Sequence, residues 1–103
     1  MRLTFFLSFV APPMFTLRPS SVLQVRRGST VNVCCKAKGS PPPKIEWSRA
    51  GWSTYSRLFL QQKGCVTIDT AKEDGHGSYT CHATNSYGVA QTITTVTVSG
   101  MST

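Results

Sequence analysis

The sequence predicts an all-β fold in which two antiparallel sheets pack against each other as a sandwich. The first observation is that, from Pro12 onward, short segments of alternating apolar and polar residues are separated by Gly, Pro, Ser and Asn. No segment has convincing helical periodicity. The second observation is the spacing of Cys35, Trp47, Tyr79 and Cys81, which is characteristic of small β-sandwiches.

Each expected strand is a β-patterned run bounded by turn residues, because strands favour β-branched and aromatic residues and turns favour Gly, Pro and Asn. In chain order the expected strands are Met14–Leu17, Val22–Val25, Thr30–Lys38, Lys44–Arg49, Arg57–Leu60, Cys65–Asp69, Ser78–Thr84 and Val89–Val98.

Alternation predicts which side chains face the core, since successive strand residues point to opposite faces. In the third strand Val31, Val33 and Cys35 share the inward face, and Asn32, Cys34, Lys36 and Lys38 share the outward face. In the sixth strand Val66 and Ile68 point inward, whereas Cys65 and Thr67 point outward. In the seventh strand Tyr79, Cys81 and Ala83 point inward, and residues 85–88 supply the turn to the last strand.

The length of 103 residues accommodates one domain, which we expect to span residues 12–99 with a tail at 100–103. Residues 1–11 have three interpretations. They have the positive start and apolar run of a signal peptide but are shorter than usual. They also suit the last strand of a preceding domain, or an artificial extension. The run is too short to span a bilayer, so we expect no membrane insertion by this segment.

The formal charge of +7 favours acidic partners such as sulphated glycans, anionic lipid headgroups or nucleic acid. A nucleic-acid site would need basic residues clustered with stacking aromatics, and the aromatic residues here fall at core positions instead, so we expect no nucleic-acid partner. The four cysteines indicate an oxidising compartment, and from the sequence alone they allow three pairings. Their spacing does not suit zinc.

The chain resembles the I-set of the immunoglobulin superfamily from Pro12 to Val98. The resemblance lies in a set of motifs whose spacing matches the family without insertion or deletion from Arg57 to Val98. These motifs are Pro12-Pro13, Gly28-x-x-Val31-x-Val33-x-Cys35, Gly39-Ser40-Pro41-Pro42-Pro43 leading to Trp47, Gly64-x-Val66-x-Ile68, Gly77-x-Tyr79-x-Cys81-x-Ala83-x-Asn85-x-x-Gly88 and Val96-x-Val98. The family has a Greek-key immunoglobulin-like sandwich.

The resemblance implies two disulfides. Cys35 and Cys81 pair across the core, with Trp47 and Tyr79 buried beside them, and the bridge closes a loop of about 47 residues. In the family register Cys34 lies opposite Cys65 on the outer face, which predicts a second, solvent-facing bridge.

One position departs from the family pattern. Gly75 stands where the family usually has an Asp that pairs with an Arg at the start of the fifth strand, here Arg57, while Asp74 lies one residue earlier. The Arg57–Asp74 ion pair is therefore in doubt.

Two surface features are candidate binding sites. The family register places Lys36 near Lys63, with Lys38 further along the outer face, and this group is a candidate anionic-ligand patch for a sulphated glycan or, alternatively, an ordinary solvated face. Trp52 beyond Gly51 is a candidate interface anchor, and the alternative is a Trp folded over the sheet edge.

The sequence offers no catalytic or metal site and requires no cofactor. His76, His82 and the acids Glu46, Asp69, Glu73 and Asp74 fit no arrangement of nucleophile, base and orienting group. Family resemblance instead implies an extracellular, non-catalytic recognition module of an adhesion, receptor or matrix protein, which binds a protein partner, often homophilically. The alternative is an intracellular structural I-set domain of a muscle or cytoskeletal protein, whose cysteines would stay reduced.

Overall fold

A computed structural model of the chain describes residues 9–50, 64–71 and 75–100. In this part of the chain the strands are β1 (Ala11–Leu17), β2 (Val22–Arg26), β3 (Thr30–Cys34), β4 (Lys36–Ser40), β5 (Lys44–Arg49), β6 (Cys65–Asp69), β7 (Gly77–Asn85) and β8 (Gly88–Ser99). No helix that is long and apolar enough to cross a membrane occurs among the described residues.

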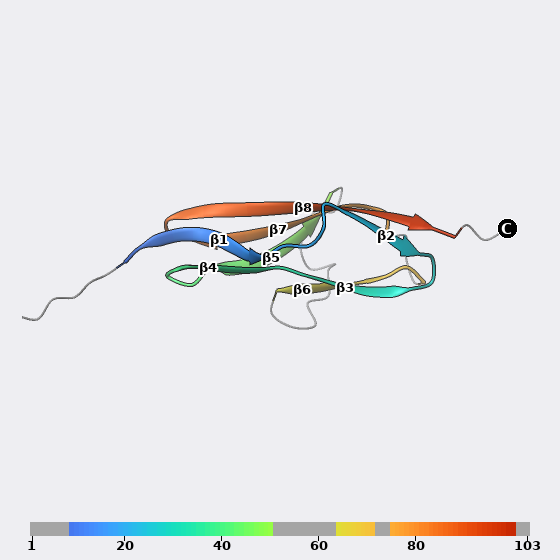
Figure 1. Ribbon diagram of the computed structural model, residues 1–103, viewed down its shortest axis with the longest axis horizontal. Helices are drawn as coiled ribbons and strands as arrows, with labels where there is room; N and C mark the ends of the chain where they lie inside the picture. The colour runs from blue at the N-terminus through green and yellow to red at the C-terminus, as the bar shows by residue number, and fades with distance from the viewer. Residues whose placement is uncertain (1–8, 51–63, 72–74, 101–103) are drawn as a thin grey trace, which may run out of the picture.

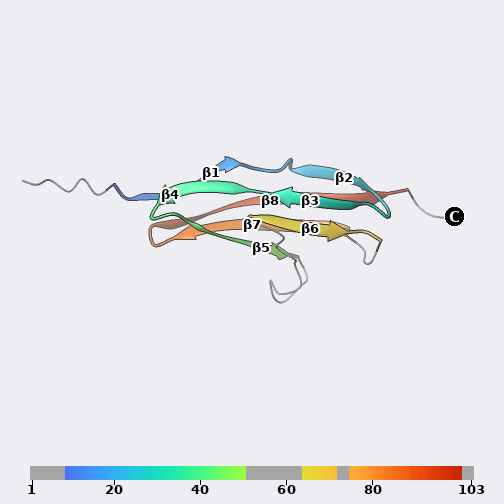
Figure 2. The same cartoon turned by 90° about the horizontal axis from the view of Figure 1, so that it is seen from below.

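The strands form two layers. One layer is the four-stranded sheet β2-β8-β7-β5, and the other contains the pairs β3-β6 and β1-β4. These two pairs share a layer because β4 continues the chain directly from β3 (Figures 1 and 2). The two-layer, all-strand architecture confirms the predicted fold class.

The strand expected at Thr30–Lys38 is divided in the structure. β3 pairs with β6 as far as Cys34, and β4 pairs with β1 from Lys36 onward. Cys35 lies between them, and its backbone N–H donates to the Gly64 carbonyl at 2.9 Å. The division follows from a change of hydrogen-bonding partner within one stretch of chain. The expected strand Arg57–Leu60 lies outside the described residues.

One pairing is parallel, although the prediction was of antiparallel sheets. β2 runs parallel to β8, with Val22 opposite Thr95 and Val25 opposite Val98. The chain leaves β1 in one layer and joins β8 in the other through residues 18–21. So short a link moves the chain between the layers without reversing it. The described pairings among β1, β3, β4, β5, β6, β7 and β8 are antiparallel.

Alternation places the core between the layers as predicted. The buried cluster takes side chains from both of them: Val25, Val33, Cys35, Trp47, Val66, Ile68, Tyr79, Cys81 and Val96. Phe15, Leu23, Val31, Ile45 and Val98 pack against this cluster from its margins. Burial of this apolar surface is the main favourable contribution to folding.

At one end of the sandwich, Asn85 connects three segments. Its side-chain amide donates to the carbonyls of Ala11 at 2.8 Å and Pro41 at 2.9 Å, and its Oδ1 accepts from the backbone N–H of Tyr87 at 2.8 Å. Asn85 thereby joins the start of β1, the β4–β5 loop and the β7–β8 turn. This end of the molecule is fixed by side-chain hydrogen bonds to backbone groups.

Candidate functional site

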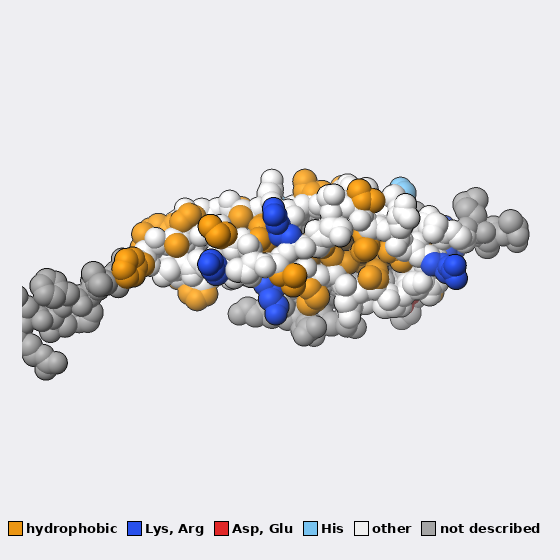
Figure 3. All heavy atoms as spheres, in the orientation of Figure 1, with side chains coloured by type: hydrophobic (Ala, Val, Ile, Leu, Met, Phe, Trp, Pro, Cys, Tyr) orange, Lys and Arg blue, Asp and Glu red, His pale blue; other side chains and the backbone are white. Residues whose placement is uncertain are grey.

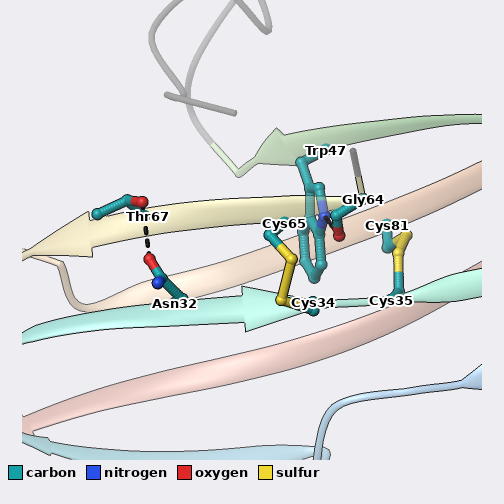
Figure 4. The surroundings of a disulfide bond; sticks show 8 residues. All are labelled: Asn32, Cys34, Cys35, Trp47, Gly64, Cys65, Thr67 and Cys81. Carbon is teal, nitrogen blue, oxygen red and sulfur yellow. Dashed lines mark hydrogen bonds between the residues drawn. A yellow bond between two sulfur atoms is a disulfide. The ribbon is translucent and has the colours of Figure 1, made fainter. Parts of the chain in front are cut away.

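Two disulfides leave adjacent residues of the chain in opposite directions. Cys34 is opposite Cys65 in the β3–β6 register and is bonded to it, with 4.0 Å between the two Cα atoms. Cys35 is bonded to Cys81 on β7, with 6.8 Å between the Cα atoms. Figure 4 shows the two bridges side by side. The first bridge joins two strands of one layer, and the second joins the two layers.

The prediction that the Cys34–Cys65 bridge faces solvent was wrong for Cys65. Cys65 retains only 5% of its accessible surface, and Cys34 is half-buried. The two short side chains bond to each other across closely spaced strands, so each covers part of its partner. Facing away from the core is therefore not the same as being exposed.

Trp47 is held in the core beside both bridges. Its side chain is 1% exposed, and its indole Nε1 donates to the Gly64 carbonyl at 3.0 Å. That carbonyl also accepts the backbone N–H of Cys35 at 2.9 Å. Gly64 has a φ of 87°, and a Cβ at this position would stand 2.5 Å from the Cys35 carbonyl oxygen. Only glycine fits a backbone that approaches Cys35 so closely.

Tyr79 closes the corner between β6 and β7. Its hydroxyl donates to the Gly75 carbonyl at 2.9 Å, and its side chain is 1% exposed. A Cβ at position 75 would stand 2.6 Å from Ile68 Cγ2 and 3.1 Å from Thr70 Cγ2. Glycine thus replaces the Asp of the family pattern at a position where Ile68 and Thr70 leave no room for a side chain. The Arg57–Asp74 pair lies outside the described residues.

Arg49 takes part in the same corner, which the sequence analysis missed. Its Nη2 donates to the His76 carbonyl at 2.9 Å, and its guanidinium carbon lies 5.2 Å from the centre of the Tyr79 ring. The side chain is 9% exposed, because residue 49 points inward from β5 in register with Trp47. The signal in the sequence is the alternation of β5, which places this charged residue at an inward position.

The predicted anionic-ligand patch is described only in part. Lys36 and Lys38 are both exposed on β4, opposite Leu17 and Met14 of β1, and Arg18 follows directly after β1. Figure 3 shows Lys and Arg side chains among exposed hydrophobic ones over this region. Lys63 and the predicted interface anchor Trp52 lie outside the described residues.

A serine and a histidine meet on the outer face of the four-stranded sheet. Ser48 Oγ lies 3.2 Å from His82 Nε2, and Glu46 is opposite His82 in the β5–β7 register. These residue types occur together in hydrolase triads, but such sites also need backbone N–H donors to bind an oxyanion. Ser48 on β5 and His82 on β7 are diagonal neighbours in the β5–β7 register, so their contact is that of an ordinary cross-strand pair on a sheet surface. The arrangement gives no sign of catalysis.

No group of three or more His, Cys, Asp or Glu residues that could hold a metal ion occurs in the described ranges. Two shallow hollows lie against β1 and the link that follows it. One, of about 340 Å³, is lined by Arg18, Pro19, Ser21, Thr92 and Ile93, and the other, of about 270 Å³, by Ala11, Pro12, Met14, Lys38 and Gly39. Neither gathers acids, bases or nucleophiles in a catalytic arrangement.

Two curated proteins are similar in sequence to most of this chain. Mouse hemicentin-1 is 38% identical over 98 residues, which cover 88% of this chain and 2% of the relative. Drosophila melanogaster neuroglian is 36% identical over 81 residues, covering 78% of this chain and 6% of the relative. The chain therefore spans only a small part of the curated relatives that it matches.

Solved structures also align with most of this chain. The insect immune protein hemolin, whose structure is described as having implications for homophilic adhesion, aligns with a TM-score of 0.74 at 31% identity over 87% of this chain and 23% of its own. A chimeric titin Z1Z2 domain aligns with a TM-score of 0.73 at 27% identity, over 88% of this chain and 97% of its own. The family profile described as "Immunoglobulin I-set domain" matches residues 13–98. The chain therefore belongs to the immunoglobulin I-set family.

Proposed function

We propose that this chain is a non-catalytic, extracellular recognition module that makes protein–protein contacts within a larger adhesion, receptor or matrix protein. The observation that carries the proposal is the presence of two disulfides, Cys35–Cys81 and Cys34–Cys65. Small domains of secreted and cell-surface proteins use disulfides in this way, whereas the cytosol keeps thiols reduced. The likeness to neuroglian and hemolin supports the same assignment.

The alternative is an intracellular structural I-set domain, which the titin neighbour supports. The two proposals differ in the state of the cysteines. In the extracellular case all four are oxidised, and in the intracellular case the native protein contains free thiols.

The full-length parent protein in its native cells provides the test. Cells are quenched in acid and denatured, their thiols are labelled with a polymer-linked maleimide, and the label on this domain is counted with and without prior reduction. We expect no label before reduction and four after it. Four labels without reduction would overturn the extracellular assignment. A membrane-impermeant biotin reagent applied to intact cells provides an independent measure of location.

A second candidate function is binding of a sulphated glycan through Lys36, Lys38 and Lys63. The observation that favours it is the exposure of Lys36 and Lys38 on one face of β4. Elution from a heparin column tests it: K36E/K38E should elute at lower salt than the control pair R26E/K44E, which changes the total charge equally. If both pairs lowered the elution salt concentration equally, net charge alone would explain the retention, which would contradict a glycan site on β4. Trp52 remains a predicted interface anchor.

A further inference from the structure

The two disulfides differ in how a reagent from solution can reach them. We call Cys34–Cys65 the outer bridge and Cys35–Cys81 the inner bridge. Cys35 and Cys81 expose 1% and 0% of their surface, so a reagent reaches the inner bridge only when the domain opens. Cys34 is half-buried, whereas Cys65 exposes 5% of its surface. A molecule in solution therefore meets the outer bridge on the side of Cys34.

The fold has other contacts that hold β3 and β6 together besides the outer bridge. The two strands pair over 5 residues each, and Thr67 Oγ1 donates to Asn32 Oδ1 at 2.8 Å on the same two strands (Figure 4). Val33 and Val66 lie in the core cluster, which also contains both cysteines of the inner bridge. Opening the outer bridge therefore leaves the strand pairing, the core and the inner bridge in place.

The surroundings of Cys34 attract anions. Lys36 and Lys38 follow Cys34 on the same side of the chain, because Cys35 and Ala37 between them point to the other side. Both lysines are exposed. Alternate residues of an extended chain are about 7 Å apart, so the charge of Lys36 acts on a molecule that approaches Cys34.

Two acids are among the described residues, and both lie away from Cys34. Glu46 is on β5 in the other layer, where it pairs with Lys44 at 3.8 Å. Asp69 lies opposite Thr30, at the other end of the β3–β6 register from the bridge. The part of the chain that the structure describes therefore presents cations and no acid beside Cys34, which favours an anionic reagent.

We propose that the outer bridge is a thiol–disulfide exchange site, at which a small anionic thiol attacks Cys34. The inference rests on the proposed extracellular function, because the bridge forms and persists in an oxidising compartment. It adds a reversible covalent modification to that function, at a position that leaves the fold intact.

The exchange takes place in two steps. The thiolate sulfur of the incoming molecule bonds to Cys34 Sγ, the Sγ–Sγ bond breaks, and its electron pair leaves on Cys65 Sγ, which takes a proton from water. A second thiolate then attacks the sulfur bound to Cys34, forms a disulfide with it and releases Cys34 as a thiolate. Two external thiols are thereby oxidised by two electrons in total, and the outer bridge is reduced by the same two electrons.

The first test treats the complete folded chain with about 5 mM reduced glutathione, an anionic thiol, at about pH 8. Samples are quenched in acid, their free thiols are labelled with a maleimide, and the labels are counted by intact mass. We expect two labels, which appear at least about 100-fold faster than any further label, while Trp fluorescence stays that of the folded chain. The matched control C34A/C65A should gain no label under the same conditions.

A second test measures the effect of charge by comparing glutathione with cysteamine, a cationic thiol. K36E should lower the ratio of the glutathione rate to the cysteamine rate at least about threefold, because it replaces attraction of the anion by repulsion. Comparing this ratio between chains cancels the intrinsic reactivity of each thiol. The matched control R26E changes the total charge equally at an exposed position of β2 and should leave the ratio nearly unchanged.

A third test identifies the sulfur that reacts. The variant C65A leaves Cys34 as a free thiol, and C34A leaves Cys65, so both variants lack the same bridge. Cys34 should exchange with oxidised glutathione at least about tenfold faster than Cys65, because it is the more exposed of the two.

Four outcomes would each overturn the inference: no label in the unmodified chain, reduction of both bridges together, equal changes of the rate ratio in K36E and R26E, or faster exchange at Cys65. An outer bridge that resists thiols, in a native protein whose four cysteines are all oxidised, would leave the recognition function intact. Four free thiols in the native protein would overturn that function instead.

Discussion

The two disulfides differ in what they join, although they begin at neighbouring residues. Cys35–Cys81 links the two layers, and its cysteines are 1% and 0% exposed. Cys34–Cys65 links β3 to β6, two strands that already pair in one layer, and Cys34 is only half-buried. In the unfolded chain both bridges restrict a long loop, but in the folded chain only the inner one also fills the core.

A disulfide contributes to stability through both the unfolded and the folded state. The sequence separations of 46 and 31 residues give the two bridges similar effects on the unfolded chain. The difference between them should therefore come from packing.

Replacing the inner bridge should have the largest effect. C35A/C81A should lower the free energy of unfolding by about 4 kcal/mol or more, from lost loop restriction and from cavities in the core. Denaturant unfolding monitored by Trp fluorescence measures it. A loss smaller than that caused by replacing the outer bridge would contradict the contribution of core packing to the inner one.

Replacing the outer bridge should cost less. Its cysteines lie outside the buried core cluster, so C34A/C65A leaves no cavity there and should lower the free energy of unfolding by about 3 kcal/mol or less. The same denaturant titration applies, with near-UV circular dichroism as a control that Trp47 keeps its environment. A change in that spectrum would show that the outer bridge also shapes the core.

Replacing Trp47 tests the contact that lies between the two bridges. Trp47→Phe removes the donor to the Gly64 carbonyl and leaves unfilled volume, so it should cost about 2 kcal/mol. The carbonyl keeps the Cys35 N–H as a donor, which limits the loss. Thermal unfolding gives the value, and a cost near zero would contradict the role of Trp47 as a core anchor.

The smallest effect is expected within the β3–β6 layer. Thr67 Oγ1 donates to Asn32 Oδ1 at 2.8 Å on the exposed side of this pair. Thr67→Val keeps the shape but removes the bond, and should cost about 0.5 kcal/mol. The cost of Thr67→Val is measured by thermal unfolding both in the unmodified chain and in C34A/C65A. The difference shows whether this cross-strand bond contributes more to stability once the bridge is absent. An equal cost in both backgrounds would show that the two act independently.

Much of the fold could be predicted because it depends on local patterns. Strict alternation placed Val33, Cys35 and Ile68 inward, and the family motifs placed Trp47 and Tyr79 in the core. What the sequence missed involves contacts between distant segments. The burial of Cys65, the change of partner between β3 and β4, and the corner made by Arg49 and Tyr79 each depend on which strands become neighbours.

Gly75 illustrates the limit most clearly. From the sequence it was a departure from the family pattern that put an ion pair in doubt. In the structure Ile68 and Thr70 occupy the space that a side chain at position 75 would need, so restoring an Asp there should destabilise this chain. Whether a position has room for a larger side chain depends on its neighbours in space, and these cannot be read from the sequence pattern.

Alternation and spacing are local properties of a chain, so they were enough to predict the fold class, the inward and outward faces of most strands and the residues of the core. The differences between the outward faces arise only when the strands assemble. It placed Lys36 and Lys38 on one layer and the Lys44–Glu46 ion pair with the exposed Val22, Val89 and Ile93 on the other. The character of a surface arises from strands that are distant in sequence and become neighbours only when the layers assemble.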